Sequence, residues 1–344
     1  MFRNLGYLWS LLPGIITITG NVMGGFWVYG NLVFSLVILS AVEWFMPENK
    51  SNRHSKNDFV PDMILIFHVI LQLTSLVALF YSFSAGRIQG HQIIGAAIST
   101  GILSGTSAIV VAHELVHRKS KFFRSLGKLL LFSAGNIYFY VEHLRGHHKW
   151  VGTDKDPATA KRGESLYRFF VRSMSGQIKS AWHLEEIRLK KEGRSVLNNA
   201  VLQNSILQAA LLVGLFIGLG PMAVAIYLHQ VLVANFLLEY TNYIEHYGLT
   251  RTENERVKED LSWQTDKVVS RFFLIDLSRH SDHHYYSSKP YHTLETHANS
   301  PKLPGGYASA IYLALFPPLW FKVVDRCLDN FKNSEIEKFK TNPG

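Results

Sequence analysis

The chain has 344 residues, of which 47% are hydrophobic and only 18% are charged, so it is neither a disordered chain nor a coiled coil. A single cysteine, Cys327, excludes an internal disulfide, a cysteine-ligated zinc site and a four-thiolate iron centre. The net charge of +9 suits nucleic acid, anionic lipid or an acidic protein as partner, and the sixteen histidines are the first functional indication.

Four long segments without Asp, Glu, Lys or Arg predict six membrane-spanning helices. One crossing of a bilayer core of about 30 Å needs about 20 helical residues. The runs Asn4–Val42 (39 residues) and Ser195–Leu238 (44 residues) are each long enough for two crossings, whereas Met63–Gly86 (24) and Ile88–His113 (26) allow one each. We expect the six helices near residues 6–24, 27–45, 63–84, 92–113, 198–218 and 221–241. Tight turns are expected at Gly24-Gly25 and at Gly218–Pro221.

A fifth uncharged run, Leu303–Phe321, has 19 residues and contains several helix breakers. They are Pro304, Gly305, Gly306, Pro317 and Pro318. We therefore expect a re-entrant segment, or one packed under a soluble cap, rather than a seventh crossing.

The basic residues predict the orientation. Six crossings place both termini on one side, and that side holds every Lys and Arg except Arg87. The positive-inside rule assigns it to the cytoplasm. We find no nucleic-acid-reading motif, and the N-terminal stretch lacks a cleavage site, so it is expected to be a signal anchor.

The predicted fold is an all-α integral membrane protein with six transmembrane helices and a cytoplasmic helical cap that carries a histidine-rich dimetal site. Four parts follow in chain order: helices one to four in residues 1–113, a cytoplasmic segment 114–197, helices five and six in 198–241, and a cytoplasmic segment 242–344 with the possible re-entrant stretch 303–321.

Nine of the histidines gather near the ends of the fourth and sixth predicted helices and in the two polar segments. They are His113 and His117; His143, His147 and His148; His246; and His280, His283 and His284. On a helix the side chains i, i+3 and i+4 share a face, so each cluster can offer two or three nitrogens to one centre. One metal ion cannot use nine imidazoles but two can, and imidazole suits iron, copper and zinc. The pattern predicts a dimetal site.

Four carboxylates stand next to these histidines in sequence and are candidate partners for their ring N–H groups. They are Glu114, Glu142, Glu245 and Asp282. The remaining seven histidines receive other interpretations. His68 and His229 are expected to hydrogen-bond between membrane helices, and His54, His91 and His183 to be exposed. His292 and His297 either support the third cluster or have no role in it.

Two other functions compete. "HELVH" contains the H-E-x-x-H motif of zinc proteases, but that interpretation accounts for two histidines and leaves seven unexplained. A metal transporter would place its ligands near the bilayer midplane, inside the helices. The nine histidines lie at or beyond helix ends, which favours an enzyme.

The segments "HELVHR", "EHLRGHH", "NYIEHYGL" and "SRHSDHH" resemble the integral-membrane alkane monooxygenases, also called alkane 1-monooxygenases or alkane hydroxylases, of the membrane diiron fatty-acid desaturase and hydroxylase superfamily. "TDKDPATAKRGESLYRF" and "LPGGYASAIYLALFPPLW" also look like that family, so the resemblance runs from Ala112 to about Asp325. The chain departs from many members at Arg118, where they have Lys, and at Leu144, where they have Asn. Neither departure affects a proposed ligand, but both leave the substrate open.

The resemblance implies two irons held by the nine histidines, activation of O2, and hydroxylation of the terminal methyl group of alkanes to primary alcohols. It also implies a bacterial inner membrane and electrons from rubredoxin, or a ferredoxin-type donor, with its NAD(P)H-dependent reductase. The alternatives are a xylene-type hydroxylase of aromatic methyl groups and a fatty-acid desaturase. We expect no fused rubredoxin domain within these 344 residues, because that domain needs four cysteines.

Two further sets of residues are weaker candidates. The small residues Gly101, Ser104 and Gly105 of the fourth helix are candidates for lining a substrate channel, with close helix packing as the alternative. Four basic residues after the second cluster are candidates for docking the electron donor, with contact to anionic lipid as the alternative. They are Lys149, Lys155, Lys161 and Arg162.

Overall fold

The computed structural model describes residues 2–52 and 59–341, and every regular element in these two ranges is a helix, joined by turns and irregular loops. No strand occurs in these two ranges, where two isolated β-bridges join loops, Glu48 with Lys267 and Gln264 with Lys302. The expectation for His54 lies outside the described residues. The predicted all-α class is confirmed.

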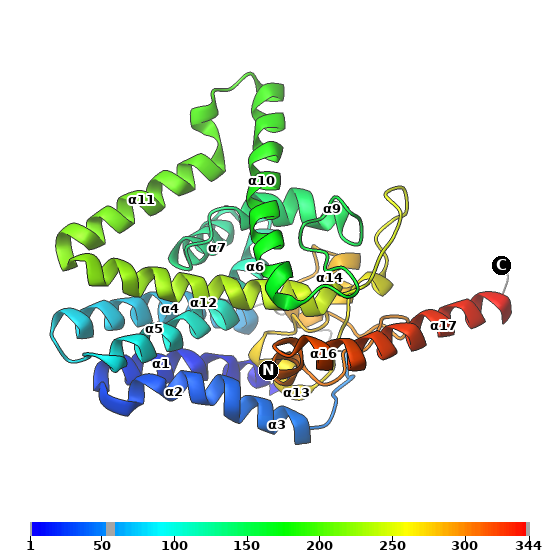
Figure 1. Cartoon of the computed structure of the whole chain (residues 1–344), viewed down its shortest axis with the longest axis horizontal. Helices are drawn as coiled ribbons and strands as arrows, with labels where there is room; N and C mark the ends of the chain where they lie inside the picture. The colour runs from blue at the N-terminus through cyan, green and yellow to red at the C-terminus, as the bar shows by residue number, and fades with distance from the viewer. Residues whose placement is uncertain (1, 53–58, 342–344) are drawn as a thin grey trace.

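Six helices of the described chain are long and apolar enough to cross a membrane, as the uncharged runs predict. They are Leu5–Met23, Gly25–Phe45, Phe59–Ser84 (α4), His91–His117, Ala200–Leu219 (α11) and Pro221–His246 (α12). In Figure 1 they form a bundle whose hairpin turns lie together at the left of the view.

Three of the six spans are composites in which 3-10 or π turns interrupt the α-helix. The first joins η1 (Phe2–Leu11) and α1 (Leu12–Met23). The second joins η2 (Gly25–Tyr29), α2 (Gly30–Leu32), the π turn η3 (Val33–Ile38) and α3 (Leu39–Phe45). The fourth joins α5 (His91–Leu103), the π turn η4 (Ser104–Ile109) and α6 (Val110–His117).

The predicted turns are present, and glycine conformations explain them. Gly24, Gly25 and Gly220 have φ of 67°, 57° and 84°, a region that side chains with a Cβ rarely adopt. Pro221 follows as the first residue of α12, where its missing N–H costs no hydrogen bond.

The fourth and sixth spans continue past their predicted ends at residues 113 and 241. The charge criterion ends a span at the first ionisable residues, but here those carboxylates are buried and paired. Glu114 accepts from Arg118 (2.7 Å), and in the sixth span Glu239 accepts from Gln177 (2.7 Å) and Glu245 from the Tyr307 hydroxyl (2.7 Å). The spans therefore end at His117 and His246, with three of the clustered histidines inside them.

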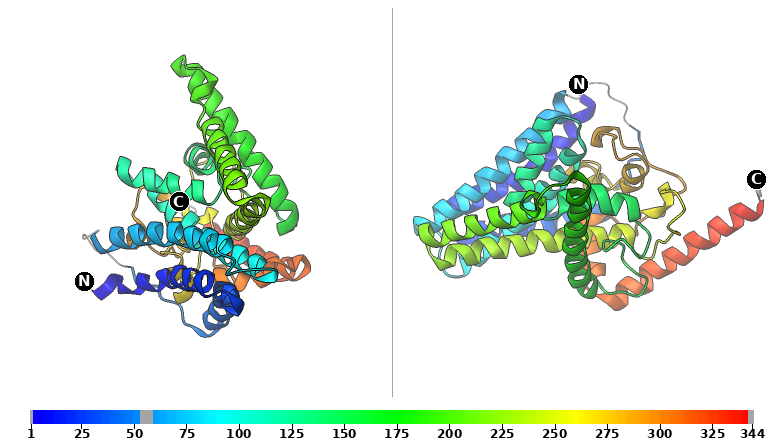
Figure 2. Two further views of the ribbon diagram at one scale, coloured as in Figure 1. Left: turned by 90° about the vertical axis from the view of Figure 1, so that its left-hand side faces the viewer. Right: turned by 90° about the horizontal axis from the view of Figure 1, so that it is seen from above.

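Most of the remaining elements gather at the end of the bundle opposite the hairpin turns (Figures 1 and 2). After α6 come α7 (Lys121–Ser133), α8 (Phe139–Glu142), the π turn η5 (His143–His147), α9 (His148–Trp150), α10 (Leu166–Glu192) and η6 (Val196–Asn198). After α12 come η7 (Glu259–Leu261), α13 (Val268–Phe273), α14 (His280–Tyr285), η8 (Tyr291–Thr293), α15 (Tyr307–Ala314), α16 (Pro317–Trp320), η9 (Phe321–Asp325) and α17 (Arg326–Thr341).

Helix α7 differs from its neighbours because it packs back along α6, beside the spans. At its end the Ser133 hydroxyl accepts from Gln72 of α4 (3.3 Å), and the Ser133 carbonyl accepts from Gln230 of α12 (3.1 Å). Part of the polar segment 114–197 thus lies alongside the bundle rather than beyond it.

The stretch predicted as re-entrant is a bent pair of helices. Tyr307–Ala314 and Pro317–Ser334 meet at 117° across a short break before Pro317 and Pro318. Two consecutive prolines start α16 because neither can continue the preceding helix. Whether this pair enters the bilayer stays a prediction.

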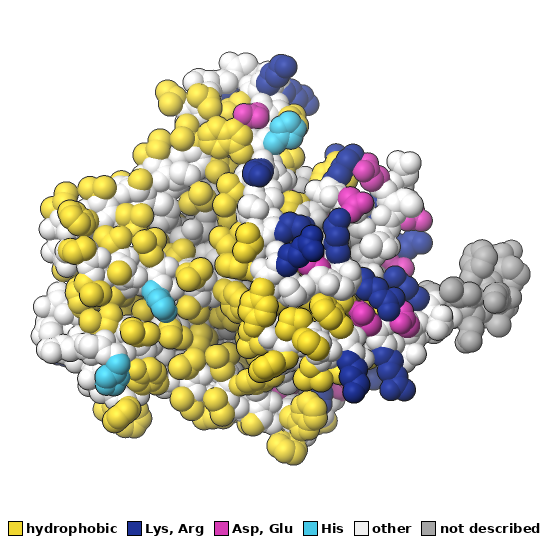
Figure 3. All heavy atoms as spheres, in the orientation of Figure 1, with side chains coloured by type: hydrophobic (Ala, Val, Ile, Leu, Met, Phe, Trp, Pro, Cys, Tyr) yellow, Lys and Arg dark blue, Asp and Glu magenta, His cyan; other side chains and the backbone are white. Residues whose placement is uncertain are grey.

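The surface divides by polarity. In Figure 3 hydrophobic side chains cover the part of the view occupied by the spans. Lys, Arg, Asp and Glu gather at the opposite end and at the top of the view, where α10 ends. Helix α11 buries little of its surface, and Ile206, Val213 and Ile217 are exposed on it. This division is the one expected of a multi-pass protein with its bundle in lipid.

Candidate metal centre

The nine clustered histidines, far apart in sequence, converge on one region at the polar end of the bundle. They come from α6, the η5–α9 segment, the end of α12, and α14. They form two groups, and within each group one side-chain nitrogen per residue lies within 4.8 Å of the others. The five-histidine group is His113, His117, His143, His148 and His283; the four-histidine group is His147, His246, His280 and His284.

Local helix geometry decides which group each side chain joins. His113 and His117 on α6, and His280 and His284 on α14, are four residues apart and share a group.

In the π turn η5, residues five apart face the same way, so His143 pairs with His148 while His147 turns to the other group. The second cluster therefore supplies histidines to both groups. The third cluster does so as well, since His283 joins the five-histidine group while His280 and His284 join the other. The α-helical spacing expected from sequence does not give this division.

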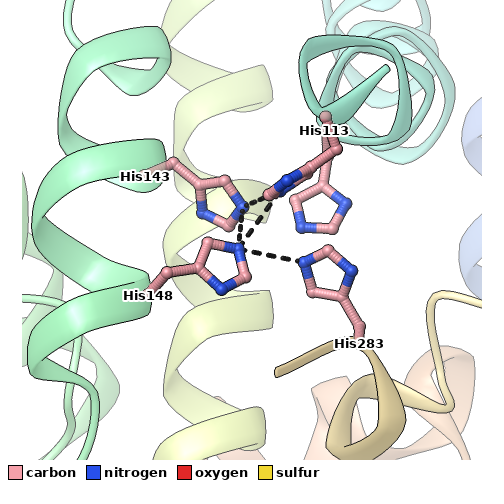
Figure 4. Close-up of side chains that lie close together, drawn as sticks. His113, His143, His148 and His283 are labelled. Atoms are coloured by element: carbon pink, nitrogen blue, oxygen red, sulfur yellow. Dashed lines mark hydrogen bonds between the residues drawn. The ribbon is translucent and has the colours of Figure 1, made fainter. Parts of the chain in front are cut away.

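Figure 4 shows His113, His143, His148 and His283 of the five-histidine group pointing toward one another from separate elements. The Nε2 atoms of His117, His143 and His148 are mutually 3.0–3.1 Å apart, and His283 Nε2 is 3.1 Å from that of His148. A ring nitrogen carries either one proton or one lone pair, so such a triangle cannot be satisfied by N–H···N bonds alone.

A metal ion satisfies this arrangement. Bonds from imidazole to a transition metal are about 2.0–2.1 Å, so two nitrogens bound at a right angle lie about 3.0 Å apart. In the four-histidine group the Nε2 atoms of His280 and His147 lie 2.9 and 3.2 Å from that of His284. The Nε2 atoms of His113 and His246 are buried without a hydrogen-bond partner. Both groups therefore fit a bound cation.

The electrostatics keep the rings ready to coordinate. Burial, together with the neighbouring imidazoles, holds the pKa of His143, His148 and His283 well below its ordinary value. These rings are neutral at physiological pH, and a neutral imidazole offers the lone pair that a metal needs.

Hydrogen bonds to Nδ1 orient two rings of the four-histidine group, those of His147 and His246. His147 Nδ1 lies 3.0 Å from the Asp156 carboxylate, which also accepts from the Thr159 hydroxyl (2.6 Å). His246 Nδ1 donates to the Leu261 carbonyl (3.1 Å), which directs its Nε2 into the group. Sequence reasoning missed Asp156, and its only signal was the family-like stretch "TDKDPATAK".

The four predicted carboxylates have different surroundings. Glu245 lies beside the group, with one oxygen 3.2 Å from His280 Nε2. In the described contacts Glu114 accepts from Arg118 (2.7 Å) and Glu142 from Ser180 (3.2 Å). Asp282 pairs with His297 Nε2 (2.7 Å) and Lys289 (3.0 Å). Only for Glu245 do these contacts include a ring of the nine histidines.

The other histidines lie outside the two groups. Both ring nitrogens of His68 are bonded between spans, to Ser10 (2.8 Å) and Ser107 (2.7 Å), as expected. His292 is buried. His297 is half-buried and pairs with Asp282. His91 and His183 are exposed, as expected. His229 is also exposed on α12, so the expected hydrogen bond between membrane helices is wrong for this residue.

Two neighbouring apolar cavities, the outer and inner parts of a candidate channel, lie between the membrane bundle and the histidines. The inner part is lined by His113, His143, His147 and His280. The outer part, about 760 Å³ including the open mouth, lies among α1, η3, η4, α12, α13 and α15. Both parts share three lining residues, Gly105, Val110 and Thr241.

Of the three small residues predicted to line a channel, Gly105 borders the cavity and the other two lie in helix contacts. A Cβ on Gly101 would meet Val233 of α12 at 2.7 Å. The Ser104 hydroxyl donates to Gln230 (2.9 Å) and accepts from Gln72 (2.8 Å).

Comparison with known proteins places the chain. The fatty acid desaturase family profile matches residues 89–313, which include all nine clustered histidines. Alkane 1-monooxygenase 2 of Pseudomonas aeruginosa is 35% identical over 316 residues, 87% of this chain and 83% of the relative. The chain belongs to the fatty acid desaturase family, and within it to the alkane 1-monooxygenases.

Two other relatives show how far the likeness extends. Alkane 1-monooxygenase 1 of Pseudomonas aeruginosa is 40% identical over 67% of this chain, but this match spans only 63% of that relative's length. The hydroxylase component of the xylene/toluene monooxygenase of Pseudomonas putida is 27% identical over 91% of this chain and 86% of its own. The chain is therefore also similar to this hydroxylase component along most of its length, at a lower identity.

The basic residues predicted to dock a donor are exposed on the polar end of this desaturase-family chain. Lys149 and Lys155 lie over the Trp150 ring, 4.5 and 4.6 Å from its centroid. Three of the four also pair with acidic residues: Lys155 with Glu253 (2.6 Å), Lys161 with Asp154 (3.1 Å) and Arg162 with Asp329 (2.7 Å).

Proposed function

We propose that the chain is a membrane diiron monooxygenase that hydroxylates the terminal methyl group of alkanes to primary alcohols. One observation carries the proposal: the inner apolar cavity has His113, His143, His147 and His280 in its wall and adjoins the outer cavity in the membrane bundle, with which it shares three lining residues. A saturated hydrocarbon dissolved in lipid reaches such a cavity without crossing water.

Iron is the metal that this donor set and family favour. The five- and four-histidine groups would each hold one ion, and neutral imidazoles without thiolate suit iron. Bound iron would supply the activation of O2, in which one oxygen atom enters the C–H bond and the other leaves as water with two electrons and two protons.

The residues of the chain bind, orient and exclude water. Leu39, Leu237, Phe273 and Ile311 give the cavity an apolar wall that holds an alkyl chain by contact alone. A dry cavity also protects reactive species from water. Asp156 and the Leu261 carbonyl keep two rings in a single orientation.

The electrons come from a second protein. The sequence has no flavin or dinucleotide fingerprint. We propose that rubredoxin, or a ferredoxin-type donor, with its NAD(P)H-dependent reductase, docks near Lys149, Lys155, Lys161 and Arg162. In this proposal the protein lies in a bacterial inner membrane with both termini and all histidine clusters on the cytoplasmic side.

Hydroxylation of an aromatic methyl group is the second candidate. The likeness to the xylene/toluene hydroxylase component over 91% of the chain favours it. The cavity wall is apolar for either substrate, so the substrate itself has to be tested.

Product analysis decides between them. Membranes containing the chain, with added rubredoxin, reductase and NADH, receive octane, hexadecane or p-xylene. Primary alcohols from an alkane support the proposal, and benzylic alcohol alone supports the second candidate. Reductant-dependent O2 uptake that no substrate stimulates, with metal flux across vesicles, would contradict both.

A further inference from the structure

The second span buries a carboxylate that the proposed function does not use. Glu43 of α3 is fully buried. One of its oxygens accepts from the backbone N–H (3.1 Å) and the hydroxyl of Ser270. The other accepts from the backbone N–H (2.8 Å) and the hydroxyl of Ser309 (2.9 Å).

Both partners are the third residues of helices, Ser270 in α13 and Ser309 in α15. The first N–H groups of a helix have no partner within it, and a negative charge at that end is favourable. Glu43 therefore caps two helices at once and joins them to the second span.

The turn before α15 leaves room for this carboxylate. A Cβ on Gly306 would overlap all three atoms of the Glu43 carboxylate group. Gly305 has a φ of +91°, which also favours glycine. The two glycines of "LPGGYASA" thus have a physical reason.

The two capped helices form one wall of the apolar cavity. They supply Val269, Ser270, Phe273, Tyr307, Ala308 and Ile311 to its lining. Leu39, one turn before Glu43 on α3, lines the cavity as well.

The same wall continues to the four-histidine group. The Ser270 hydroxyl accepts from the Tyr307 N–H (2.7 Å), and the Tyr307 hydroxyl donates to Glu245 (2.7 Å). The other Glu245 oxygen lies 3.2 Å from His280 Nε2. Four polar contacts thus connect Glu43 to one nitrogen of the four-histidine group, His280 Nε2.

We propose that Glu43 is a positioning residue that sets which substrate carbon faces the histidine groups, because it holds α13, α15 and Tyr307 as one rigid wall. This inference rests on the proposed function. A misplacement of about 1 Å at a reacting centre costs up to about 10²-fold in rate, so a loosened wall changes which carbon reacts.

The first test measures regioselectivity. Glu43→Gln keeps the side-chain volume but presents an amide N–H₂ to donors, so it disrupts part of the cap. We expect normal bound iron and at least a threefold rise in the ratio of 2-octanol to 1-octanol from octane. Glu48→Gln, which removes an exposed carboxylate five residues away, is the matched control and should leave the ratio unchanged. An unchanged ratio in iron-loaded Glu43→Gln overturns the proposal.

The second test measures stability and needs no activity. Gly306→Ala should lower the melting temperature of the parent protein in detergent, because its Cβ meets the Glu43 carboxylate. In a Glu43→Ala or Glu43→Asp background, Gly306→Ala should lower the melting temperature by less than half as much. If Gly306→Ala lowers the melting temperature equally in all backgrounds, Gly306 does not pack against the Glu43 carboxylate and the proposal is overturned. If the parent makes no alkanol, the proposed function fails, while this coupling still tests the placement of Glu43.

Discussion

Asp156 accepts from Nδ1 of the His147 ring (3.0 Å), and that single contact orients the Nε2 atom that His147 offers to the four-histidine group. Losing a carboxylate behind a metal-binding histidine costs about 10- to 100-fold in metal affinity. We expect Asp156→Ala to retain iron that much more weakly in competition with a chelator, and Asp156→Asn to fall between it and the parent. The control is Asp154→Ala, an exposed neighbour. Equal iron retention by Asp156→Ala and the control would contradict the role.

At this scale the sequence predicted the nine clustered histidines, since their spacing and placement identified them, and the structure brings all nine together. The partners were harder to predict. Asp156 follows His147 by nine residues in an irregular turn, where no periodicity relates the two side chains. Glu114 and Asp282 adjoin histidines in sequence, but successive residues on a helix point about 100° apart. Their carboxylates therefore contact Arg118, Lys289 and His297.

Among the elements, the π turn η5 divides the second cluster between the two groups. Deleting Leu144 from it should restore an α-helical turn and rotate His143 relative to His147 and His148 by about 100°. We expect the deletion variant to lose at least half of its bound iron, measured by metal analysis of purified protein. Leu144→Ala keeps the chain length and should retain the iron. A deletion variant with full iron content would show that the π turn is dispensable.

The sequence could not reveal this turn. H-x-x-x-H-H has the spacing of an α-helical site, so an α-helix accounts for it as well as a π turn does. The extra residue per turn that defines the π turn depends on how η5 packs against neighbouring elements, which the sequence pattern does not reveal. Arg145, inside the turn, pairs with Glu185 of α10 at 2.6 Å.

Glu185 also joins α10 to the start of α11, since it accepts from Arg188 (2.7 Å) and the Ala200 N–H (2.8 Å). Burial raises the pKa of Glu185, but the hydrogen bonds from Arg188, Ala200 and Arg145 outweigh it and lower the pKa to about 2. A depressed carboxylate pKa stabilises the fold above the unfolded value of about 4.3, and this contribution is lost as pH falls toward 2.

Glu185→Gln should therefore lower the melting temperature at pH 7, and its difference from the parent should shrink between about pH 4.3 and 2. The measurement is a thermal melt in detergent at several pH values. Glu186→Gln, an exposed neighbour on α10, is the control. A difference that does not vary with pH would contradict the ion-pair role.

The cavity supports a prediction about chain length. Val110 lines both its outer and inner parts, whereas a Cβ on Gly105 already meets Leu237 at 2.8 Å, which makes Val110 the better site to enlarge. Val110→Phe should shift the preferred alkane to shorter chains, measured as relative turnover from octane to hexadecane. Val77→Phe, exposed on α4, should leave the preference unchanged. An unshifted preference in an iron-loaded Val110→Phe variant would mean that substrate enters elsewhere.

For the whole molecule, composition alone predicted the six spans, because the lipid core excludes charge over about 20 helical residues at a time. It could not predict where charge is tolerated. Glu43 and Glu245 are buried in or at the ends of spans because each has hydrogen-bond donors from distant parts of the chain, whereas Glu114 is paired with Arg118 one turn further on. The return of α7 along α6 was also invisible, since its basic residues are typical of a polar segment.

The charge distribution leads to the last prediction, which concerns electron delivery. In the proposed orientation all Lys and Arg except Arg87 belong to the termini and polar segments on the cytoplasmic side, and rubredoxin-type donors are expected to be acidic. Complementary charge raises the rate of encounter more than the affinity, and salt weakens it as the Debye length falls from about 10 Å at 0.1 M to about 3 Å at 1 M. Lys149, Lys155, Lys161 and Arg162 are our docking candidates.

Replacing these four by Glu should raise the donor concentration needed for half-maximal turnover and reduce its salt dependence, with iron content unchanged. Three of the four are already paired with acidic groups, so part of the effect would come from releasing Glu253, Asp154 and Asp329. The control makes the same change in net charge with four exposed basic residues of α10: Arg168, Lys179, Lys190 and Lys191. If both four-fold variants respond equally to donor and salt, the donor senses overall charge and the docking patch lies elsewhere.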